Sequence, residues 1–295
     1  MGFDSYHPAI HAIFFASVIL CSICFRHPVY LALSFCCAMC CLTKLRGRKG
    51  LVFSLALLPF AALFSLWYGC YHHFGLTVLR HNFIGNAMTL ESLLCGLTIG
   101  VTAASVLVWL GCVHAVFTAD KVVYLFGRLS PRLSLFLSLL LRMVPRIKAQ
   151  AGRINNARRA LGRGSDQGNL CQRFCHCMRL CSILITWLIE SLVTTSQSMR
   201  SRGSTLRGRT AFSLYRFDNR DRTLVVVIFT CLTVLLMAFL LDQTAVLFDP
   251  AVIITPITPL SCLFCAVYAV YCLLPALLQT VYERRFARLR RQNCQ

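Results

Sequence analysis

Long apolar runs dominate the chain and show no alternation with a period of two. They lie at about residues 10–25, 29–43, 51–68, 89–117, 224–241 and 253–278. A transmembrane helix needs roughly 20 apolar residues, and continuous apolarity disfavours a membrane β-barrel. The pattern predicts an all-α polytopic membrane protein with about six membrane helices. The first two runs are short for spans and are predicted to form a hairpin through Arg26-His27-Pro28.

The segment between the fourth and fifth runs has a different character, because basic residues interrupt its apolar stretches. Residues 129–144 form an amphipathic pattern that we expect to end as a helix at Pro145. Residues 147–164 predict a polar, Arg-rich helix, and a turn follows at 164–169. Residues 171–199 predict another helix, apolar through its middle, and residues 201–221 are basic and irregular.

Composition and charge fit a membrane protein. Of the 295 residues 57% are apolar and 14% are charged, and 30 Lys/Arg against 10 Asp/Glu give a net charge of +20. Nearly all the basic residues fall at 44–49, at 121–222 and in the tail. The positive-inside rule places these three segments, and with them both termini, on the cytoplasmic face. Topology therefore explains the charge without nucleic acid as a partner.

These patterns divide the chain into four regions. Residues 1–117 are predicted to hold the N-terminal transmembrane helices, and residues 118–222 a cytoplasmic region of long Arg-bearing helices. Residues 223–280 are predicted to hold the C-terminal transmembrane helices, and residues 281–295 form a basic cytoplasmic tail.

Two Arg-rich elements flank the apolar helix of the central region, at residues 153–164 and 198–203. Each places arginines beside small residues near an expected helix end. Small neighbours leave a guanidinium free to bind carboxylates through two parallel hydrogen bonds. A helix of about 28 residues between them would be about 40 Å long, which suits a partner with two equivalent grooves. The alternative is ordinary positive charge beside a membrane.

Several blocks, in order over residues 7–242, resemble one transporter family. They are His7-Pro8, Thr89-Leu90-Glu91-Ser92-Leu93 with Gly96, Leu141-Arg142-Met143-Val144-Pro145, residues 157–164, and Ser201-Arg202-Gly203 followed by Gly208-Arg209-Thr210. The chain is similar to the transmembrane T component of energy-coupling factor transporters, which are ATP-driven importers of vitamins and metal ions in bacteria and archaea.

The resemblance implies a non-catalytic scaffold in the cell membrane. Its two Ala-Arg-Gly-like motifs would dock on two ABC-type ATPase subunits, which bind the ATP and Mg, and its helices would hold a separate substrate-binding S component. No cofactor is expected in this chain. The implied ATPase-docking residues are Arg202, Arg163, Arg158, Ser201, Gly203, Gly162 and Gly164.

The first motif has two possible alignments. Without a gap it falls on Ala160-Leu161-Gly162, which lacks the arginine, and with a shift of two residues it falls on Gly162-Arg163-Gly164. Arg158 or Arg159 could substitute from the preceding half-turn, so the identity of the first anchor stays open.

Other candidates have simpler explanations. Cys171, Cys175, Cys177 and Cys181 around His176 are expected to pack on a helix rather than bind metal, and Cys36, Cys37, Cys40 and Cys41 lie within a run. His72, His73 and His81 predict a polar extracellular loop, with metal handling as the alternative. Glu190 is either a functional intramembrane carboxylate or a solvated one.

The chain lacks the phosphate loop of ATPases and the His-Glu-x-x-His and Gly-x-Ser-x-Gly motifs of hydrolases. We therefore expect no catalysis. The competing functions are a membrane-embedded enzyme and a self-contained secondary permease.

Overall fold

The computed structural model describes residues 6–72, 74–81, 87–129, 131–203, 206, 215, 217–248, 252–256 and 258–292. Across these residues the chain forms nine α-helices and four short strands, which confirms the all-α prediction. The chain divides into two compact units. The first unit comprises Met1–Thr118 and Tyr215–Gln295, and the second unit comprises Ala119–Leu214.

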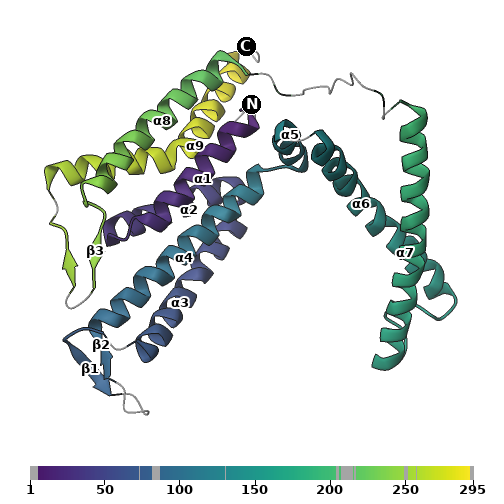
Figure 1. Ribbon diagram of the computed structural model, residues 1–295, viewed down its shortest axis with the longest axis horizontal. Coiled ribbons are helices and arrows are strands. Elements are labelled where there is room, and N and C mark those ends of the chain that lie inside the picture. Colours follow the sequence, from purple (N-terminus) through teal and green to yellow (C-terminus); the bar gives the residue numbers. More distant parts are fainter. Residues whose placement is uncertain are drawn as a thin grey trace. The chain divides into compact units, whose positions relative to one another are not determined.

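The first unit is a bundle of six helices (Figure 1). These are α1 (Pro8–Cys24), α2 (Pro28–Arg46), α3 (Arg48–Tyr71), α4 (Leu90–Val116), α8 (Asn219–Leu240) and α9 (Pro259–Gln292). Two antiparallel strand pairs connect helices at one end of the bundle, β1 (Val78–His81) with β2 (Ala87–Thr89), and β3 (Val246–Leu247) with β4 (Ile253–Ile254). The final apolar run is thus a short strand and a helix, and α9 continues into the basic tail.

A histidine–proline pair starts each of the first two helices. The proline occupies the first helical turn, where its missing N–H is not needed. The Nδ1 atom of the preceding histidine accepts a hydrogen bond from a backbone N–H, His7 from Ala9 at 3.2 Å and His27 from Val29 at 3.3 Å. The hairpin between the first two runs therefore turns at His27, where α2 begins.

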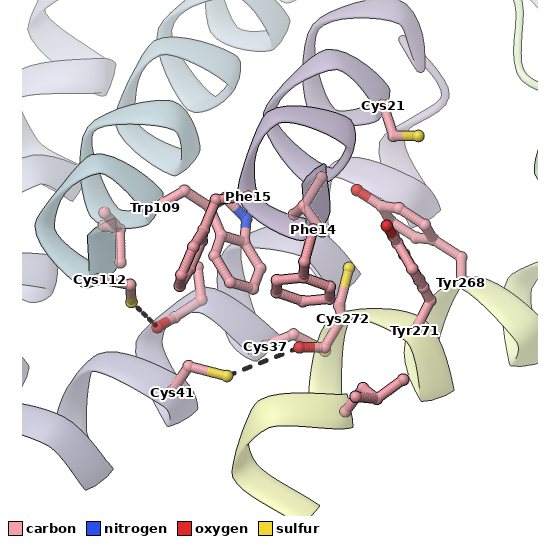
Figure 2. Packing of buried hydrophobic residues seen from close by; sticks show 14 of the residues in the cluster. Phe14, Phe15, Cys21, Cys37, Cys41, Trp109, Cys112, Tyr268, Tyr271 and Cys272 are labelled. Atoms are coloured by element: carbon pink, nitrogen blue, oxygen red, sulfur yellow. Dashed lines mark hydrogen bonds between the residues drawn. The ribbon is translucent and has the colours of Figure 1, made fainter. Parts of the chain in front are cut away.

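Aromatic rings from α1, α4 and α9 form the centre of the first unit (Figure 2). Phe14 contacts Tyr271 and Trp109 at ring-centroid distances of 5.3 and 6.5 Å. The Nε1 atom of Trp109 donates to the Ser34 hydroxyl of α2 at 3.2 Å, and this hydroxyl lies 2.8 Å from that of Ser22 in α1. These bonds link three helices inside an apolar core, where an unpaired polar group would be costly.

Buried cysteines fill spaces around these rings, as small hydrophobic side chains do. Cys37, Cys41, Cys112 and Cys272 are each at most 5% exposed, and all the cysteines that the structure describes are free. The prediction that thiols inside the apolar runs pack as core residues is confirmed for Cys37 and Cys41, whereas Cys36 and Cys40 are exposed.

Helices α3 and α4 approach each other closely at two glycines. A Cβ atom on Gly100 would lie 2.8 Å from the carbonyl oxygen of Ala61, and one on Gly96 would lie 3.1 Å from the Cα of Ser65. The Ser65 hydroxyl donates to the carbonyl of Leu93 at 2.7 Å across the same interface. Small residues at such a crossing allow two backbones to pack closely within a membrane.

The second unit consists of three helices, α5 (Ala119–Leu129), α6 (Pro131–Ala160) and α7 (Leu170–Ser201). Helix α6 packs against both α5 and α7. The predicted helix end at Pro145 is wrong, because α6 runs unbroken through this residue. A proline removes one backbone hydrogen bond and strains the preceding turn, but α6 continues past it. Helices α3 and α9 also contain an internal proline.

Six described helices are long and apolar enough to cross a membrane, namely α2, α3, α4, α7, α8 and α9. The chain is thus a multi-pass membrane protein, as predicted. The set of spanning helices differs from the predicted set, because it includes α7 and leaves out α1. Helix α1 has only 17 residues, about 25 Å of helix against a hydrocarbon core of about 30 Å, whereas α7 reaches the required length with no buried residue.

The close approach at Gly100 predicts a large effect of a small substitution. Gly100→Val should lower the free energy of unfolding by about 1–3 kcal/mol, because the added methyl groups meet backbone atoms of α3. Thermal unfolding in detergent, followed by circular dichroism, measures the change. Gly152→Ala in α6 is the control, since a Cβ there meets no atom within 4 Å. An unaltered melting temperature in Gly100→Val would contradict the packing described here.

Candidate partner-docking site

The C-terminus of α6 carries the first Arg-rich element. Gly162 adopts φ +70°, a conformation that glycine accepts without steric strain. The N–H of Gly162 donates to the carbonyl of Arg159 at 3.0 Å, and the N–H of Arg163 donates to that of Arg158 at 2.9 Å. These two bonds form the Schellman motif, which satisfies carbonyls at a helix end.

The C-terminus of α7 carries the second element and ends in the same way. Gly203 has φ +75°, and its N–H donates to the carbonyl of Arg200 at 3.0 Å. Arg202 is the last residue before this glycine and is exposed, as is Ser201. An arginine here lies at the negative end of the helix dipole, which favours its positive charge.

The two helix ends establish which residues are structurally equivalent. The last helical residue is small in both, Ala160 and Ser201, and the left-handed glycine stands two positions later. Leu161 therefore occupies the position of Arg202, and it is 77% exposed. The gap-free alignment, which places the first motif on residues 160–162, therefore matches the backbone of the second motif. The arginine adjacent to Gly162 is Arg163, which follows the glycine instead of preceding it.

Two arginines of the first element make contacts inside the second unit. The half-buried Arg158 donates from Nη1 to the carbonyl of His176 in α7 at 3.1 Å. Arg159 donates from Nε to the Asp166 carboxylate at 2.9 Å and forms an ion pair with it. Both arginines thus hold the α6–α7 connection. Arg159 and Arg163 are both exposed, but among the contacts described only Arg159 has a side-chain partner, which leaves Arg163 as the candidate.

The connection between α6 and α7 is an ordered turn. The N–H of Ser165 donates to the side-chain carbonyl of Asn155 at 3.0 Å, and the N–H of Gly164 donates to that of Gln167 at 3.0 Å. Asn169 and Gln172 form a capping box at the start of α7. Gly164 is buried, and a Cβ there would meet Arg159, so its lack of a side chain serves the turn itself.

The remaining sequence candidates do not converge on a site. Cys171, Cys175, Cys177 and Cys181 are exposed on α7 rather than packed, so the expectation that they pack is wrong. No group of three or more potential metal ligands occurs among the residues described. Glu190 is exposed on α7. His72 is exposed after α3 and His81 ends β1, whereas His73 and the segment Gly208-Arg209-Thr210 lie outside the described residues.

The Thr89–Gly96 block forms a tight corner at the start of α4. Thr89 caps the helix by accepting from the N–H of Ser92 at 3.4 Å. The buried Glu91 carboxylate accepts hydrogen bonds from the hydroxyl of Thr77 at 2.7 Å and from its backbone N–H. Gly75, at φ +110°, lies against the same carboxylate. Sequence reasoning missed this role of Glu91, although an acidic residue in a first helical turn is a recognisable signal.

The first unit also contains a small pocket. It lies between α1, α2, α4 and α9 and is lined by apolar side chains, including Phe15, Trp109 and Val116, together with the thiols of Cys41 and Cys112. Lys44 and Gln279 supply the other polar groups. The titratable groups of the pocket are one lysine and two thiols.

No known protein-family profile matches the sequence, and a search of characterised proteins found no significant match.

The ion pair between Arg159 and Asp166 predicts a pH dependence of the α6–α7 turn. Hydrogen bonding to the Arg159 guanidinium lowers the pKa of the Asp166 carboxyl below its ordinary value of 3.8. A lowered folded-state pKa means that the pair stabilises the turn at neutral pH and that this stabilisation is lost as the pH falls through the folded pKa.

Hydrogen exchange of residues 161–169, corrected for intrinsic rates, tests this expectation. Asp166→Asn should speed exchange at neutral pH and have no effect below the folded pKa. Asn156→Ala, at an exposed position of α6, is the control. Equal exchange in wild type and Asp166→Asn at neutral pH would show that the pair does not order the turn.

Proposed function

We propose that this protein is the transmembrane scaffold of an energy-coupling factor importer. The observation that carries the proposal is the pair of glycine-terminated helix ends in the second unit. Each end combines a left-handed glycine with an exposed arginine next to it, Arg163 beside Gly162 and Arg202 beside Gly203. A partner that docks on both ends through the same contacts would consist of two equivalent subunits. Two ABC-type ATPases, which would bind the ATP and Mg, meet that requirement.

The length of α7 supports a partner with two separate grooves. The helix has 32 residues, which corresponds to about 48 Å at 1.5 Å per residue. Arg163 precedes its start by seven positions and Arg202 follows its end. Because a helix transmits displacement along its axis with little bending, it suits the transfer of movement from two ATPases to the rest of the complex.

An exposed apolar stripe on α7 supports a membrane-embedded partner. The residues that share this face by their spacing of three, four or seven are Phe174, Met178, Ile185, Ile189 and Leu192, all of them at least 44% exposed. A continuous exposed apolar surface marks a contact with protein or lipid. We propose that a substrate-binding S component covers it, and in that arrangement substrate specificity would reside in the partner chain.

The orientation of the chain follows from the positions of its basic segments. Helices α1, α3 and α8 begin at the end of the first unit where α9 finishes, and the strand pairs lie at the opposite end (Figure 1). The basic turn at 44–49 and the basic end of α9 therefore lie at the same end. By the positive-inside rule we propose that this end faces the cytoplasm, with both termini, in a bacterial or archaeal cell.

Affinity purification tests the assembly directly. The tagged chain, extracted in mild detergent, should recover two ATPase subunits and one small membrane protein, identified by mass spectrometry. Recovery of the chain alone, from membranes shown to contain such ATPases, would contradict the scaffold and favour a permease or a membrane-embedded enzyme.

Substitution of the exposed arginines tests the docking residues. Arg202→Ala and Arg163→Ala should each weaken ATPase binding by about 2–5 kcal/mol, because truncation leaves a partner charge unpaired. The measurement is the amount of ATPase retained on the purified chain. Arg179→Ala and Lys148→Ala, at exposed positions in α7 and α6 away from the helix ends and outside both Arg-rich elements, are the matched controls. If Arg202→Ala and Arg163→Ala both retain as much ATPase as the wild type, the assignment of these arginines as docking residues is wrong.

Arg158→Ala separates docking from internal structure. Because Arg158 donates to the carbonyl of His176, its loss should speed hydrogen exchange where α6 meets α7. Arg163→Ala should leave that exchange unaltered.

A further inference from the structure

The end of α2, the start of α3 and the end of α4 meet at one corner of the first unit (Figure 1). The turn between α2 and α3 passes through Gly47 at φ +64°. It is tight, because a Cβ atom on Gly50 would lie 2.7 Å from the carbonyl oxygen of Leu42. The last turn of α4 joins this corner through His114, whose Nδ1 atom lies 2.9 Å from Nη2 of Arg46.

The corner concentrates positive charge that the chain itself does not neutralise. Four exposed cations lie within six residues, namely Lys44, Arg46, Arg48 and Lys49. Residues 5–90 include no acidic residue, and none of these four side chains forms an ion pair with another residue that the structure describes. Like charges this close together repel each other, so an external anion would relieve the repulsion.

Three donors of the corner lie close together. A Cβ atom on Gly111 of α4 would lie 3.8 Å from Cε1 of Phe53 in α3. Because α3 and α4 run antiparallel, Lys49, four residues before Phe53, and His114, three residues after Gly111, lie one turn nearer to the same end. A guanidinium only donates, so Nδ1 of His114 accepts the bond from Arg46 and the neutral ring carries its proton on Nε2. An ammonium, a guanidinium and an imidazole N–H therefore gather at one spot.

Exposed apolar side chains lie one helical turn along α3 from the cations. Val52 and Phe53 follow Arg48 and Lys49 by four positions, which places each pair on one face, and they are 64% and 46% exposed. Helix α3 has 24 residues, about 36 Å of helix against a hydrocarbon core of about 30 Å. Its first turn therefore lies in the headgroup layer, and the apolar residues that follow lie among the acyl chains.

We propose that this corner is a binding site for an anionic phospholipid. Arg46 and Lys49 bind the phosphate oxygens, His114 donates from Nε2, and an acyl chain lies along Val52 and Phe53. Charged donors form strong hydrogen bonds with phosphate, and clustered Lys and Arg residues beside a transmembrane helix attract anionic lipids. A free phosphate ion would satisfy the cations but leave the apolar residues below them uncovered. Lipid binding at this corner is independent of the proposed scaffold function.

Native mass spectrometry of the full chain, purified in mild detergent, measures the binding directly. Dioleoyl phosphatidylglycerol should bind at least about tenfold more tightly than dioleoyl phosphatidylcholine, because each cation near an anionic headgroup contributes roughly fivefold in affinity. Arg46→Gln combined with Lys49→Gln should abolish this preference. Lys49→Gln alone, which leaves the bond between Arg46 and His114 intact, should weaken phosphatidylglycerol binding by about threefold or more.

Two further variants separate the site from general charge. Arg220→Gln combined with Arg222→Gln removes the same charge at the same end of the first unit, but from the start of α8, where Asp218 and Asp221 accompany the arginines. This control should keep the wild-type preference. Arg46→Lys combined with Lys49→Arg retains both charges and should also keep it. Melting temperatures in detergent show that each variant is folded.

Several results would overturn the lipid site. One is wild-type binding of phosphatidylglycerol by Arg46→Gln with Lys49→Gln, and another is an equal loss in the α8 control. A large molar excess of inorganic phosphate should leave phosphatidylglycerol bound, so displacement by phosphate would assign the corner to the free ion instead. Unaltered lipid binding together with reduced recovery of a protein partner by Arg46→Gln with Lys49→Gln would assign the cations to a protein contact.

Discussion

The packing of α1 against α4 and α9 around Trp109 is the contact on which the other features depend. It brings together rings from three helices that are distant in sequence, and the indole N–H is satisfied by Ser34 of a fourth helix. Inside lipid the bundle gains little from the hydrophobic effect between helices, so close packing and such hydrogen bonds must hold it together. Because α1 is fixed in this way, the contacts that its start makes with Phe117 and Asp221 are fixed as well.

The second unit illustrates how the end of a helix exposes particular side chains. A helix leaves its last carbonyls without partners, and a glycine in the left-handed conformation turns the chain so that backbone N–H groups can reach them. The residues on either side of that glycine then project from the end of the helix. In α7 the residue before the glycine is Arg202. In α6 the residue before the glycine is Leu161, and Arg163 follows the glycine. Two different sequences thus produce one backbone geometry with the charge displaced by two positions.

The arginines of the first element show why composition alone assigns roles poorly. Arg158, Arg159 and Arg163 lie within six residues of each other, but the first binds a carbonyl of α7 and the second pairs with Asp166. Only the folding of residues 161–169 into a turn creates those partners. Arg163 is exposed near the helix end, and among the described contacts its side chain has no partner, which is what docking on another protein requires.

Sequence by itself determined the membrane-helix architecture and the positions of the two Arg-rich helix ends, because hydrophobic runs, glycines and histidine–proline pairs act locally. It also indicated where the basic charge concentrates. It mistook Pro145 for a helix end, because a proline removes only one backbone hydrogen bond and the turns on either side of it still form. It could not choose between Arg158 and Arg163, pair His7 with Asp221, or place Phe117 beside His11. Those contacts join residues far apart in the chain, and only the tertiary structure decides which of them meet.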